Sequence, residues 1–440
     1  MWVLFILSLM SQRTSKRVRL AYGRNGLEVD VPGDADMLEP QRLSGVQDEA
    51  GAIRRALRDP IASKPLRELV PRGATVGISV CDITRPFPAS RVLPVLLDEL
   101  EHLDPARVTL FVATGTHRLC TAGEILQMLG EDVLRRVRIV QHDAFDREGH
   151  MELGLVSGSD VPVLLERAFL EQDIRLTTGF IEPHFFAGFS GGPKMIAPGL
   201  AHLDTVLELH SAARIGHPRA TWGVTQGNPV HDAVRGIAER VEVTFNLDVA
   251  LNQDHRITRV FAGDLARSHA AGCAFAMATA MVPVRKPYDV VVSTNSGYPL
   301  DQNLYQTVKG MSAAAQIVRD GGTIVMVSEG SDGLPEHGRY KDLLRQAGGG
   351  PAEFLGWLER PGPAEHDQWQ VQVQALIQRR ARVAIHAGGL TPDQVRAAWL
   401  EPVDDVSDCV AELIGAARPG ARVAVLPQGP QTIPYLRPGG

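Results

Sequence analysis

A glycine-rich turn flanked by two histidines and a lysine is the stretch of this sequence best suited to chemistry. Residues 179–211 read GFIEPHFFAGFSGGPKMIAPGLAHLDTVLELHS and contain His184, Lys194 and His210. Histidines act as bases or metal ligands near neutral pH, and a lysine beside such a turn can anchor an anion or act as an amine nucleophile. We expect the clustered glycines to let the backbone approach a planar ligand closely. The stretch therefore predicts the wall of a cofactor site.

The spacing within this stretch excludes two common nucleotide sites. It matches neither GxxxxGK[ST] nor GxGxxG, which argues against an ATP P-loop and a standard dinucleotide fingerprint. The segment AHLDTVLELHSAAR predicts a helix that carries His210 on its last turns, a stable platform for a metal ligand. No HExxH doublet accompanies it, so a metal there would need other ligands, for example from a cofactor. Taken alone, His210 also suits a capping or core role.

Two further polar segments each follow a predicted buried strand. The segment CDITRPFP contains Asp82 and Arg85. The planar guanidinium of arginine can donate two hydrogen bonds to one carboxylate, although an Asp–Arg pair can also be purely structural. ATGTHR contains Thr116 and His117. We expect this second segment to open a helix, because backbone N–H groups at a helix start suit an anion. A lone histidine in that position is equally compatible with a structural role.

The second half of the chain offers one comparable segment. YPLDQNLYQTVKG places Tyr305, Gln306 and Lys309 on one predicted helix, and Gln306 and Lys309 share a face because they are three residues apart. Such a pair can hold a carboxylate or can simply form a solvated helix face. We interpret four other histidines as structural or surface residues: His142, His202, His217 and His231.

Short β-branched runs alternate with helical patterns, which is typical of an α/β fold with parallel strands. The strands predicted in the first part are Ala74–Val80, Val108–Ala113, Val137–Val140, Ile174–Thr178 and Val241–Leu247. Three of them lead into the polar segments, and ligands in open α/β sheets bind beyond the carboxyl ends of the strands. We therefore expect Asp82, Arg85, His117 and His184 to converge.

The chain of 440 residues is too long for one ordinary core, so two domains are expected. A boundary is predicted near VPVRKP, separating residues 10–284, with cofactor and catalysis, from an α/β domain at 287–440. The strands predicted in the second domain are Asp289–Ser293, Thr323–Ser328, Arg382–His386 and Arg422–Leu426. Each domain should have a mainly parallel sheet flanked by helices, with the active site in the interdomain cleft. The last residues could pack back on the first domain.

The composition and the net charge of the chain argue against some classes of function. A hydrophobic share of 44% and a charged share of 22% are normal for a soluble globular protein. The net charge of −6 argues against a general nucleic-acid binder. Four scattered cysteines without a CxxC pair suit a reducing, cytoplasmic setting. Residues 1–10 are apolar but too short to span a bilayer and lack the features of a signal peptide, so we expect Met10 to be the natural start and no membrane partner.

Taken together, DITRP, ATGTHR, EPHFFAGFSGGPK with LELHS, and YQTVK resemble the nickel-dependent lactate racemase (LarA-type) family of 2-hydroxyacid racemases and epimerases. The resemblance covers most of the chain. That family uses the nickel-pincer nucleotide, pyridinium-3,5-bisthiocarboxylic acid mononucleotide nickel. The resemblance implies that Lys194 joins this cofactor covalently and that His210 is the protein ligand to nickel. It further implies that His117 and His184 are the two acid/base catalysts.

The resemblance also implies which groups bind the substrate and the cofactor. The residues it assigns to a 2-hydroxyacid substrate are Arg85, Tyr305, Gln306, Lys309 and Trp369. It places Asp82 and Thr116 at the cofactor, with Asp82 orienting the set. Cofactor-biosynthesis proteins would act as transient donors of the nickel-pincer nucleotide. Ile83 departs from the family pattern, since relatives often have a more polar residue there. This departure argues against a pocket built for lactate, and the substrate side chain stays open.

The activity implied is inversion of C2 of a lactate-like 2-hydroxyacid by reversible hydride transfer to the cofactor. An alternative in the same class is a C2 epimerase of a sugar acid such as gluconate. A nicotinamide-dependent 2-hydroxyacid dehydrogenase is a further possibility, against which the absent GxGxxG counts. A non-catalytic cofactor- or nickel-binding protein is the last alternative. The presence of both acid/base histidines argues against it, because a carrier would need only Lys194 and His210.

Overall fold

The computed structural model describes residues 14–336, 338–360, 362 and 364–437. The chain divides into two compact units, each built on a six-stranded, mainly parallel sheet. The central unit is Gln41–Thr279, and the terminal unit combines the described residues up to Pro40 with those from Ala280 onward. The predicted fold class, α/β with mainly parallel sheets flanked by helices, is confirmed. The predicted start at Met10 lies outside the described residues.

The sheet of the central unit has the strand order β13-β12-β9-β4-β5-β6. All of its neighbouring pairs are parallel except β12 with β13. The strands are β4 (Val76–Cys81), β5 (Val108–Ala113), β6 (Arg138–Gln141), β9 (Ile174–Phe180), β12 (Phe245–Leu251) and β13 (Ile257–Gly263). Two small antiparallel pairs accompany it: β7 (His150–Leu155) with β8 (Pro162–Glu166), and β10 (Pro183–His184) with β11 (Gly188–Phe189).

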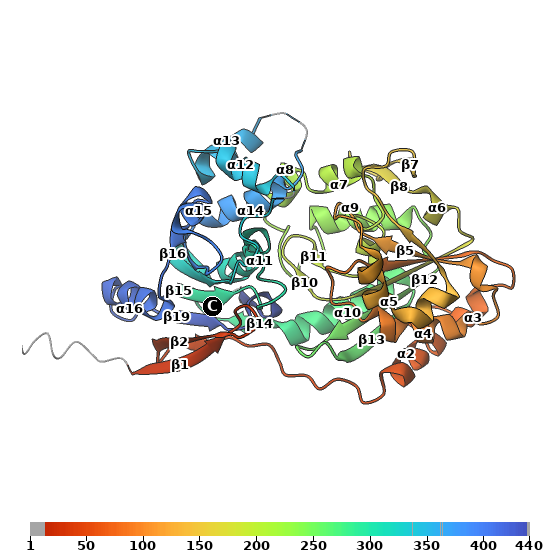
Figure 1. The fold of residues 1–440 in the computed structure, drawn as a ribbon, viewed down its shortest axis with the longest axis horizontal. Helices are drawn as coiled ribbons and strands as arrows, with labels where there is room; N and C mark the ends of the chain where they lie inside the picture. Colours follow the sequence, from red (N-terminus) through yellow and green to blue (C-terminus); the bar gives the residue numbers. More distant parts are fainter. Residues whose placement is uncertain (1–13, 337, 361, 363, 438–440) are drawn as a thin grey trace, which may run out of the picture. The chain divides into compact units, whose positions relative to one another are not determined.

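Helices of the central unit connect these strands (Figure 1). They are α2 (Glu49–Arg58), α3 (Leu66–Leu69), α4 (Ala89–Glu99), α5 (Ala122–Arg136), α6 (Arg167–Leu170), α7 (Leu203–Leu209), α8 (Ala212–Ile215), α9 (Pro229–Glu239) and α10 (Leu265–Ala280), with short 3-10 turns η1 (Pro105–Arg107) and η2 (Gly192–Met195). Side-chain caps begin several of them. Thr121 and Glu124 form a reciprocal capping box that satisfies backbone N–H groups at the start of α5.

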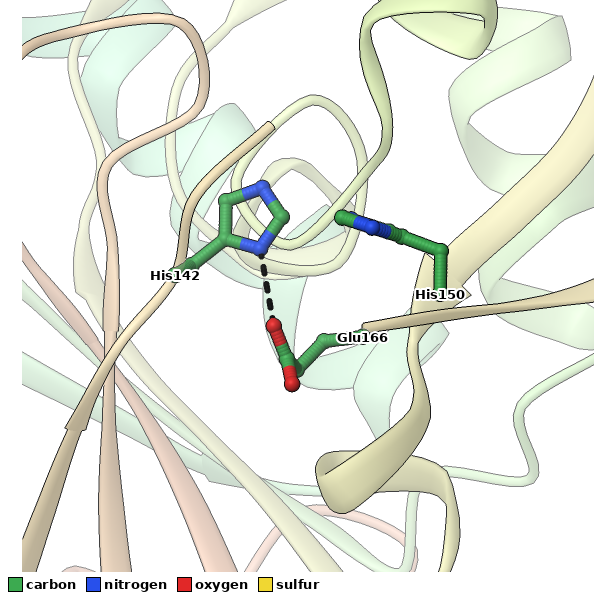
Figure 2. A group of neighbouring side chains, drawn as sticks. All are labelled: His142, His150 and Glu166. Carbon is green, nitrogen blue, oxygen red and sulfur yellow. Dashed lines mark hydrogen bonds and ion pairs between the residues drawn. The ribbon is translucent and has the colours of Figure 1, made fainter. Parts of the chain in front are cut away.

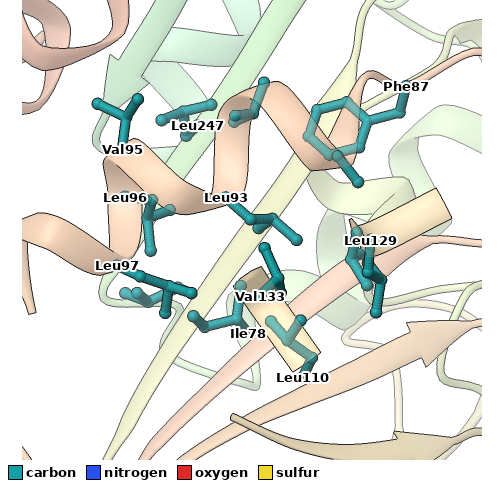
Figure 3. Close-up of a cluster of buried hydrophobic side chains, with 14 of the residues drawn as sticks. Ile78, Phe87, Leu93, Val95, Leu96, Leu97, Leu110, Leu129, Val133 and Leu247 are labelled. Carbon is teal, nitrogen blue, oxygen red and sulfur yellow. The ribbon is translucent and has the colours of Figure 1, made fainter. Parts of the chain in front are cut away.

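The side chains of β4 alternate between the two faces of the central sheet, and the two faces make different contacts. Ile78 and its even-numbered neighbours point into an apolar core shared with Leu93 of α4 and Val133 of α5 (Figure 3). Ser79 points to the opposite face, where its hydroxyl donates to the carbonyl of Met195 in η2 at 2.7 Å. Successive residues of a strand face opposite sides of a sheet. One face of the sheet is therefore packed by helices, and the other holds the segment that contains Lys194.

The terminal unit has a fully parallel sheet of order β18-β17-β16-β15-β19-β3. Its strands are β3 (Asp36–Met37), β15 (Tyr288–Thr294), β16 (Val318–Val327), β17 (Arg382–His386), β18 (Glu401–Pro402) and β19 (Val423–Leu426). A hairpin of β1 (Ser15–Leu20) and β2 (Leu27–Pro32) and a parallel pair of β14 (Met281–Val284) and β20 (Ile433–Leu436) complete its strands.

Seven helical segments cover this second sheet. They are α11 (Leu304–Ala315), α12 (Tyr340–Gln346), α13 (Pro351–Leu358), α14 (Gln368–Gln378), α15 (Pro392–Ala397), α16 (Val406–Ala416) and the 3-10 turn η3 (Gly429–Gln431) among the described residues. Val290 and Val292 of β15 pack in one apolar cluster with Val406 of α16. On the opposite face Ser293 donates to the carbonyl of Gly310 in α11 at 3.2 Å.

The two compact units divide the chain differently from the predicted domains at the N-terminal side. We predicted that residues 10–284 form one domain, but β1, β2 and β3 belong to the terminal unit. The reason is that strands far apart in the sequence pair with one another. β3 extends the second sheet beside β19, and Leu20 and Val29 of the hairpin complete its apolar cluster. The described part of the C-terminal tail also stays in this unit, because β20 pairs with β14.

The cysteines and the lengths of the helices bear on two of the predictions. All four cysteines are free, in agreement with the absence of a disulfide framework. No helix in the described part of the chain is both long and apolar enough to cross a membrane.

Candidate active site

Three polar segments of the central unit follow strands that lie side by side. β9, β4 and β5 are parallel neighbours, so their carboxyl ends meet at one edge of the sheet. Asp82 comes directly after β4, His117 lies in the turn after β5, and His184 lies in β10, beyond β9. Cys81 Sγ lies 3.6 Å from Met195 Sδ, which brings the residue before Asp82 against the residue after Lys194.

A hydrogen-bonded carboxylate and imidazole form the first part of the site. His117 Nδ1 donates to Asp82 Oδ2 at 2.8 Å, and the hydroxyl of Thr84 donates to Asp82 Oδ1 at the same distance. Asp82 is buried, whereas the side chain of His117 is 42% exposed. We predicted Asp82 at the cofactor; the structure shows it bonded to His117 and Thr84. An imidazole that donates from Nδ1 to a carboxylate carries its lone pair on Nε2.

The ionisation of Asp82 supports this assignment of the proton. Burial by itself raises the pKa of Asp82, but the hydrogen bonds that it accepts from His117 and Thr84, together with its electrostatic interactions with His117 and Arg85, outweigh the effect of burial. The net effect holds the pKa of Asp82 below its ordinary value. Asp82 is therefore a carboxylate at neutral pH and acts as the acceptor for the imidazole N–H.

The turn that carries His117 differs from the prediction. We expected ATGTHR to open a helix, but α5 begins only at Ala122, and His117 N donates to the carbonyl of Thr114 in a tight turn. The hydroxyl of Thr114 donates to the carbonyl of His142 at 2.6 Å, which ties this turn to the end of β6. Thr116 lies in the same turn, directly before His117. The helix starts later because Thr121, and not Thr116, makes the capping box.

The second part of the site gathers around the buried ring of Phe186. The ring of His184 lies 4.6 Å from the Phe186 ring and that of His210 lies 5.1 Å from it, both edge to face. Lys194 Nζ lies 5.7 Å from the centre of the same ring. The structure therefore brings three of the predicted residues together on one aromatic side chain.

His184 is held by its own backbone turn. It lies in the short β10–β11 pair, opposite Gly188. The N–H of Ala187 donates to His184 Nδ1 at 3.3 Å. The two predicted acid/base histidines thus have different supports: a buried carboxylate orients His117, and a long backbone hydrogen bond orients His184.

Two glycines of this segment are required by the protein atoms around them, and the approach of a ligand to their backbone stays a prediction. Gly188 and Gly192 have φ of +78° and +50°, a region that disfavours side chains. A Cβ at Gly188 would collide with the carbonyl oxygen of Val224, and one at Gly192 with the ring of His269. We predicted that they leave room for a planar ligand. In the structure they are required by the turn and by protein atoms packed against it.

His210 ends a helix instead of lying within one. We predicted one helix through AHLDTVLELHSAAR, but α7 stops at Leu209 and His210 is its C-cap, with α8 starting at Ala212. His210 Nδ1 donates to the carbonyl of Val206 at 2.7 Å. This bond fixes the tautomer in which Nε2 carries the lone pair, as in histidines that bind metals. The residue is 6% exposed.

Lys194 lies in η2, and buried polar contacts hold this turn. Asp248 of β12 accepts from the N–H of Gly192 at 3.0 Å and from the side-chain amide of Asn246 at 2.9 Å. Burial raises the pKa of Asp248, which is fully enclosed. Sequence reasoning missed this residue. The available signal was a single acidic residue inside the apolar strand FNLDVAL.

The remaining predicted residues lie in the terminal unit. Asn303 caps α11 by accepting from the N–H of Gln306 at 3.1 Å, and the helix carries Tyr305, Gln306 and Lys309 as predicted. Trp369 of α14 is buried, and its Nε1–H donates to the hydroxyl of Tyr305 at 3.2 Å. The structure thus joins two of the predicted substrate residues. Their role toward a substrate stays a prediction.

Comparison with known proteins identifies one family over most of the chain. Residues 22–223 match the lactate racemase N-terminal domain, and residues 284–433 match the lactate racemase C-terminal domain. A lactate racemase from Thermoanaerobacterium thermosaccharolyticum is 32% identical over 431 residues, which cover 94% of this chain and 98% of that protein. A lactate racemase from Lactiplantibacillus plantarum is 35% identical over 385 residues, which cover 87% and 90%.

Solved structures give the same result. The lactate racemase apoprotein from Thermoanaerobacterium thermosaccharolyticum matches with a TM-score of 0.87 at 31% identity, over 96% of this chain and 100% of that chain. A crystal structure of a protein from Thermotoga maritima matches with a TM-score of 0.69 at 18% identity, over 90% and 100%, and shares the fold. The chain belongs to the lactate racemase family of isomerases.

Proposed function

We propose that this protein is a nickel-pincer-nucleotide-dependent racemase that inverts C2 of a short 2-hydroxyacid such as lactate. The observation that carries the proposal is the grouping of His184, Lys194 and His210 around Phe186 in the unit that also holds the Asp82–His117 pair. These are the residue types needed for a covalent tether, a single metal ligand and two acid/base groups. Family membership supports the use of this cofactor in general terms.

The residue types in the central unit are suited to binding the proposed cofactor. His210 offers an imidazole whose tautomer is set by the Val206 carbonyl, a support that metal-binding histidines commonly have. Lys194 offers an amine in a turn that Asp248 and Ser79 hold in place. The bound group would supply an acceptor for the hydrogen that leaves C2 of the substrate with its electron pair.

The chain's own part in the reaction is proton transfer and orientation. His117 Nε2 takes the proton of the substrate hydroxyl as the C2–H bond breaks, which converts the alcohol carbon into a carbonyl carbon. Asp82 stabilises the imidazolium formed, because its carboxylate already accepts the Nδ1–H. His184 serves the opposite face of the substrate, so that return of the hydrogen to that face gives the enantiomer.

Substrate orientation is assigned to cationic and polar groups. Arg85 follows Asp82 by three residues and offers a guanidinium that suits a carboxylate. Lys309 and Gln306 on α11 provide further donors, and Tyr305 is positioned by its contact with Trp369. We propose that this second group holds the carboxylate of the substrate.

A lactate-like 2-hydroxyacid is the first candidate substrate, and a sugar acid is the second. Ile83 packs against the apolar core cluster of the central unit, next to Asp82. The side chain of Ile83 is therefore accounted for by packing and does not decide between the two substrates. The relatives in the comparison are named lactate racemases. A C2 epimerase of a sugar acid stays the second candidate.

The cofactor proposal predicts a covalent adduct on one lysine. Protein produced together with the cofactor-biosynthesis proteins should show the added mass of the nucleotide at Lys194 and about one nickel per chain. Intact-mass analysis, peptide mapping and elemental analysis check this. Lys194→Arg should lose the adduct, and His210→Ala should keep the adduct but lose nickel. Unmodified Lys194 in wild-type protein under these conditions would contradict the proposal.

The substrate proposal predicts a particular isotope pattern. In D₂O, holo-enzyme should racemise lactate, while the C2 hydrogen is returned without exchange and C2 stays protium-labelled. Chiral chromatography coupled to mass spectrometry measures both quantities on a panel of 2-hydroxyacids that includes gluconate. Deuterium at C2 would indicate proton abstraction instead of hydride transfer. Epimerisation of gluconate without turnover of lactate would favour the second candidate.

A further inference from the structure

Three buried groups that the proposed reaction does not use meet on the central unit. His142 follows β6, His150 begins β7, and Glu166 ends β8 (Figure 2). Their possible ligand atoms, one from each residue, all lie within 4.8 Å of one another. His142 and His150 are 0% and 2% exposed, and the side chain of Glu166 is 12% exposed. We had interpreted His142 only as a structural or surface residue.

The hydrogen bonds of His142 leave a lone pair facing a carboxylate. Its Nε2 lies 3.1 Å from the carbonyl of Ala201, which can only accept, so the ring proton is on Nε2. The other nitrogen, Nδ1, lies 3.2 Å from Glu166 Oε2. In the neutral ring both of these atoms are acceptors. Two buried acceptors at this distance repel each other unless a proton or a metal cation lies between them.

His150 adds a third acceptor without a partner. Its Nδ1 donates to the carbonyl of Asp146 at 2.6 Å, so the lone pair is on Nε2. That Nε2 atom is buried and has no hydrogen-bond partner. A proton between His142 and Glu166 would satisfy those two groups but not this one.

We propose that His142 Nδ1, His150 Nε2 and Glu166 form a binding site for a divalent metal ion of the zinc type, separate from the proposed nickel site at His210. One cation gives all three acceptors a partner at once. Two imidazoles and one carboxylate are a common ligand set for zinc, with water as the fourth ligand. The site is assigned to this chain alone, because all three ligands come from the central unit.

The surroundings meet the usual requirements of such a site. Metal-binding histidines commonly donate their second ring N–H to a carbonyl, and both rings do so here, to Ala201 and Asp146. Ligand atoms of a tetrahedral zinc ion are about 3.3 Å apart for bonds of about 2.0 Å. The distance of 3.2 Å between His142 and Glu166 already has this value. One possible ligand atom from each of the three residues lies within 4.8 Å of the others, so a small approach of His150 would complete the set.

A metal ion at this site would stabilise the segment between Lys194, the proposed point of cofactor attachment, and His210, the proposed nickel ligand. Ala201, which holds His142, lies between Lys194 and His210 in sequence. The N–H of Glu166 donates to the carbonyl of Leu200 at 2.9 Å. The carbonyl of His142 also accepts from Thr114 in the turn that carries His117. A metal ion here would therefore hold the segment between Lys194 and His210 in place relative to the turn that contains His117.

Cobalt titration of the full chain tests the proposal. Protein made without the cofactor pathway and stripped with a chelator should bind one Co²⁺, with visible absorption of a four-coordinate site, and Zn²⁺ should displace it. The Tm should rise with Zn²⁺. His150→Gln and Glu166→Gln should weaken binding at least 10-fold, the lower end of the loss expected for altered metal surroundings. His210→Ala should bind as wild type does.

His102→Gln is the matched control. His102 also has a buried ring nitrogen without a partner, Nδ1, while its Nε2 contacts the carbonyl of Val70, but it is not part of the cluster. Its replacement should leave Co²⁺ binding unchanged. The proposal is overturned if wild-type protein binds no Co²⁺, or if His150→Gln binds as tightly as wild type. It also fails if binding is lost in His210→Ala and kept in His150→Gln. If the Gln variants do not fold, the Zn²⁺ dependence of the wild-type Tm decides, and an unchanged Tm refutes the site.

Discussion

Replacing His117 or His184 with alanine is expected to lower turnover of the holo-enzyme by about 10²–10⁴-fold, the usual contribution of a positioned acid/base group. The physical reason is that the hydroxyl proton then has no acceptor within reach as the C2–H bond breaks. The adduct on Lys194 and the nickel content should not change, because neither ring is proposed to hold the cofactor. Racemisation rates, intact mass and nickel content measured on the same preparation check this.

His217→Ala provides the matched control for these two variants. His217 is an exposed histidine of the same unit, and its Nδ1 accepts from the backbone N–H of Arg219 at 3.2 Å. Its removal should leave turnover within about twofold of wild type, as surface substitutions away from special features usually do little. Full turnover by either His117→Ala or His184→Ala would remove that residue from the mechanism. Loss of the adduct in either variant would show that the ring acts on cofactor binding instead.

The parallel strands could be predicted from the sequence because they are buried on both faces. Such strands appear as short continuous apolar runs, and turn residues mark their ends. The predicted bounds of Val108–Ala113 and Arg382–His386 agree with β5 and β17 residue for residue. The prediction at Val241–Leu247 was displaced, since β12 starts at Phe245. Residues 241–244 have a strand-like composition but lie in the turn after α9, so propensity alone gave the wrong start.

The membership of residues 14–40 in the terminal unit could not be predicted from local pattern. β3 has only two residues, and its place beside β19 depends on a partner almost 390 positions away. A hairpin such as β1–β2 carries no local signal of the surface it packs against. Topology of this kind is decided by tertiary burial, here by the apolar cluster around Val290.

In the candidate site, reactive residue types could be predicted, but not the groups that support them. Histidine and lysine are visible as chemistry-bearing residues wherever they occur beside turns. The carbonyl of Val206 behind His210 and the carboxylate of Asp248 behind the Lys194 turn become visible only when distant segments are brought together. The three-way contact at Phe186 is of the same kind. Spacing in the sequence also cannot show which protein atoms require a glycine, as the carbonyl of Val224 does at Gly188 and the ring of His269 does at Gly192.

Asp82→Asn is expected to reduce kcat by about 10²–10⁴-fold with little change in KM, because it removes the carboxylate that fixes the tautomer of His117. The asparagine side chain can present its NH₂ group to Nδ1, which moves the ring proton to Nε2 and leaves no base facing the substrate. The size and burial of the side chain are preserved, so folding should be retained. Steady-state kinetics on holo-enzyme of verified nickel content check the prediction.

Thr84→Val tests how much the support of the Asp82 carboxylate contributes, apart from its hydrogen bond with His117. The hydroxyl of Thr84 supports Asp82 Oδ1 at 2.8 Å, whereas the bond to His117 uses Oδ2. Its loss weakens the support of the carboxylate but leaves the acceptor for Nδ1–H in place, so kcat should fall by less than about 10-fold, the effect of roughly one ordinary hydrogen bond. Equal losses in Thr84→Val and Asp82→Asn would mean that packing of the loop, not the tautomer of His117, limits the rate. A loss confined to Asp82→Asn identifies Asp82 as the residue that positions the base, because only that variant changes which nitrogen of His117 carries the proton.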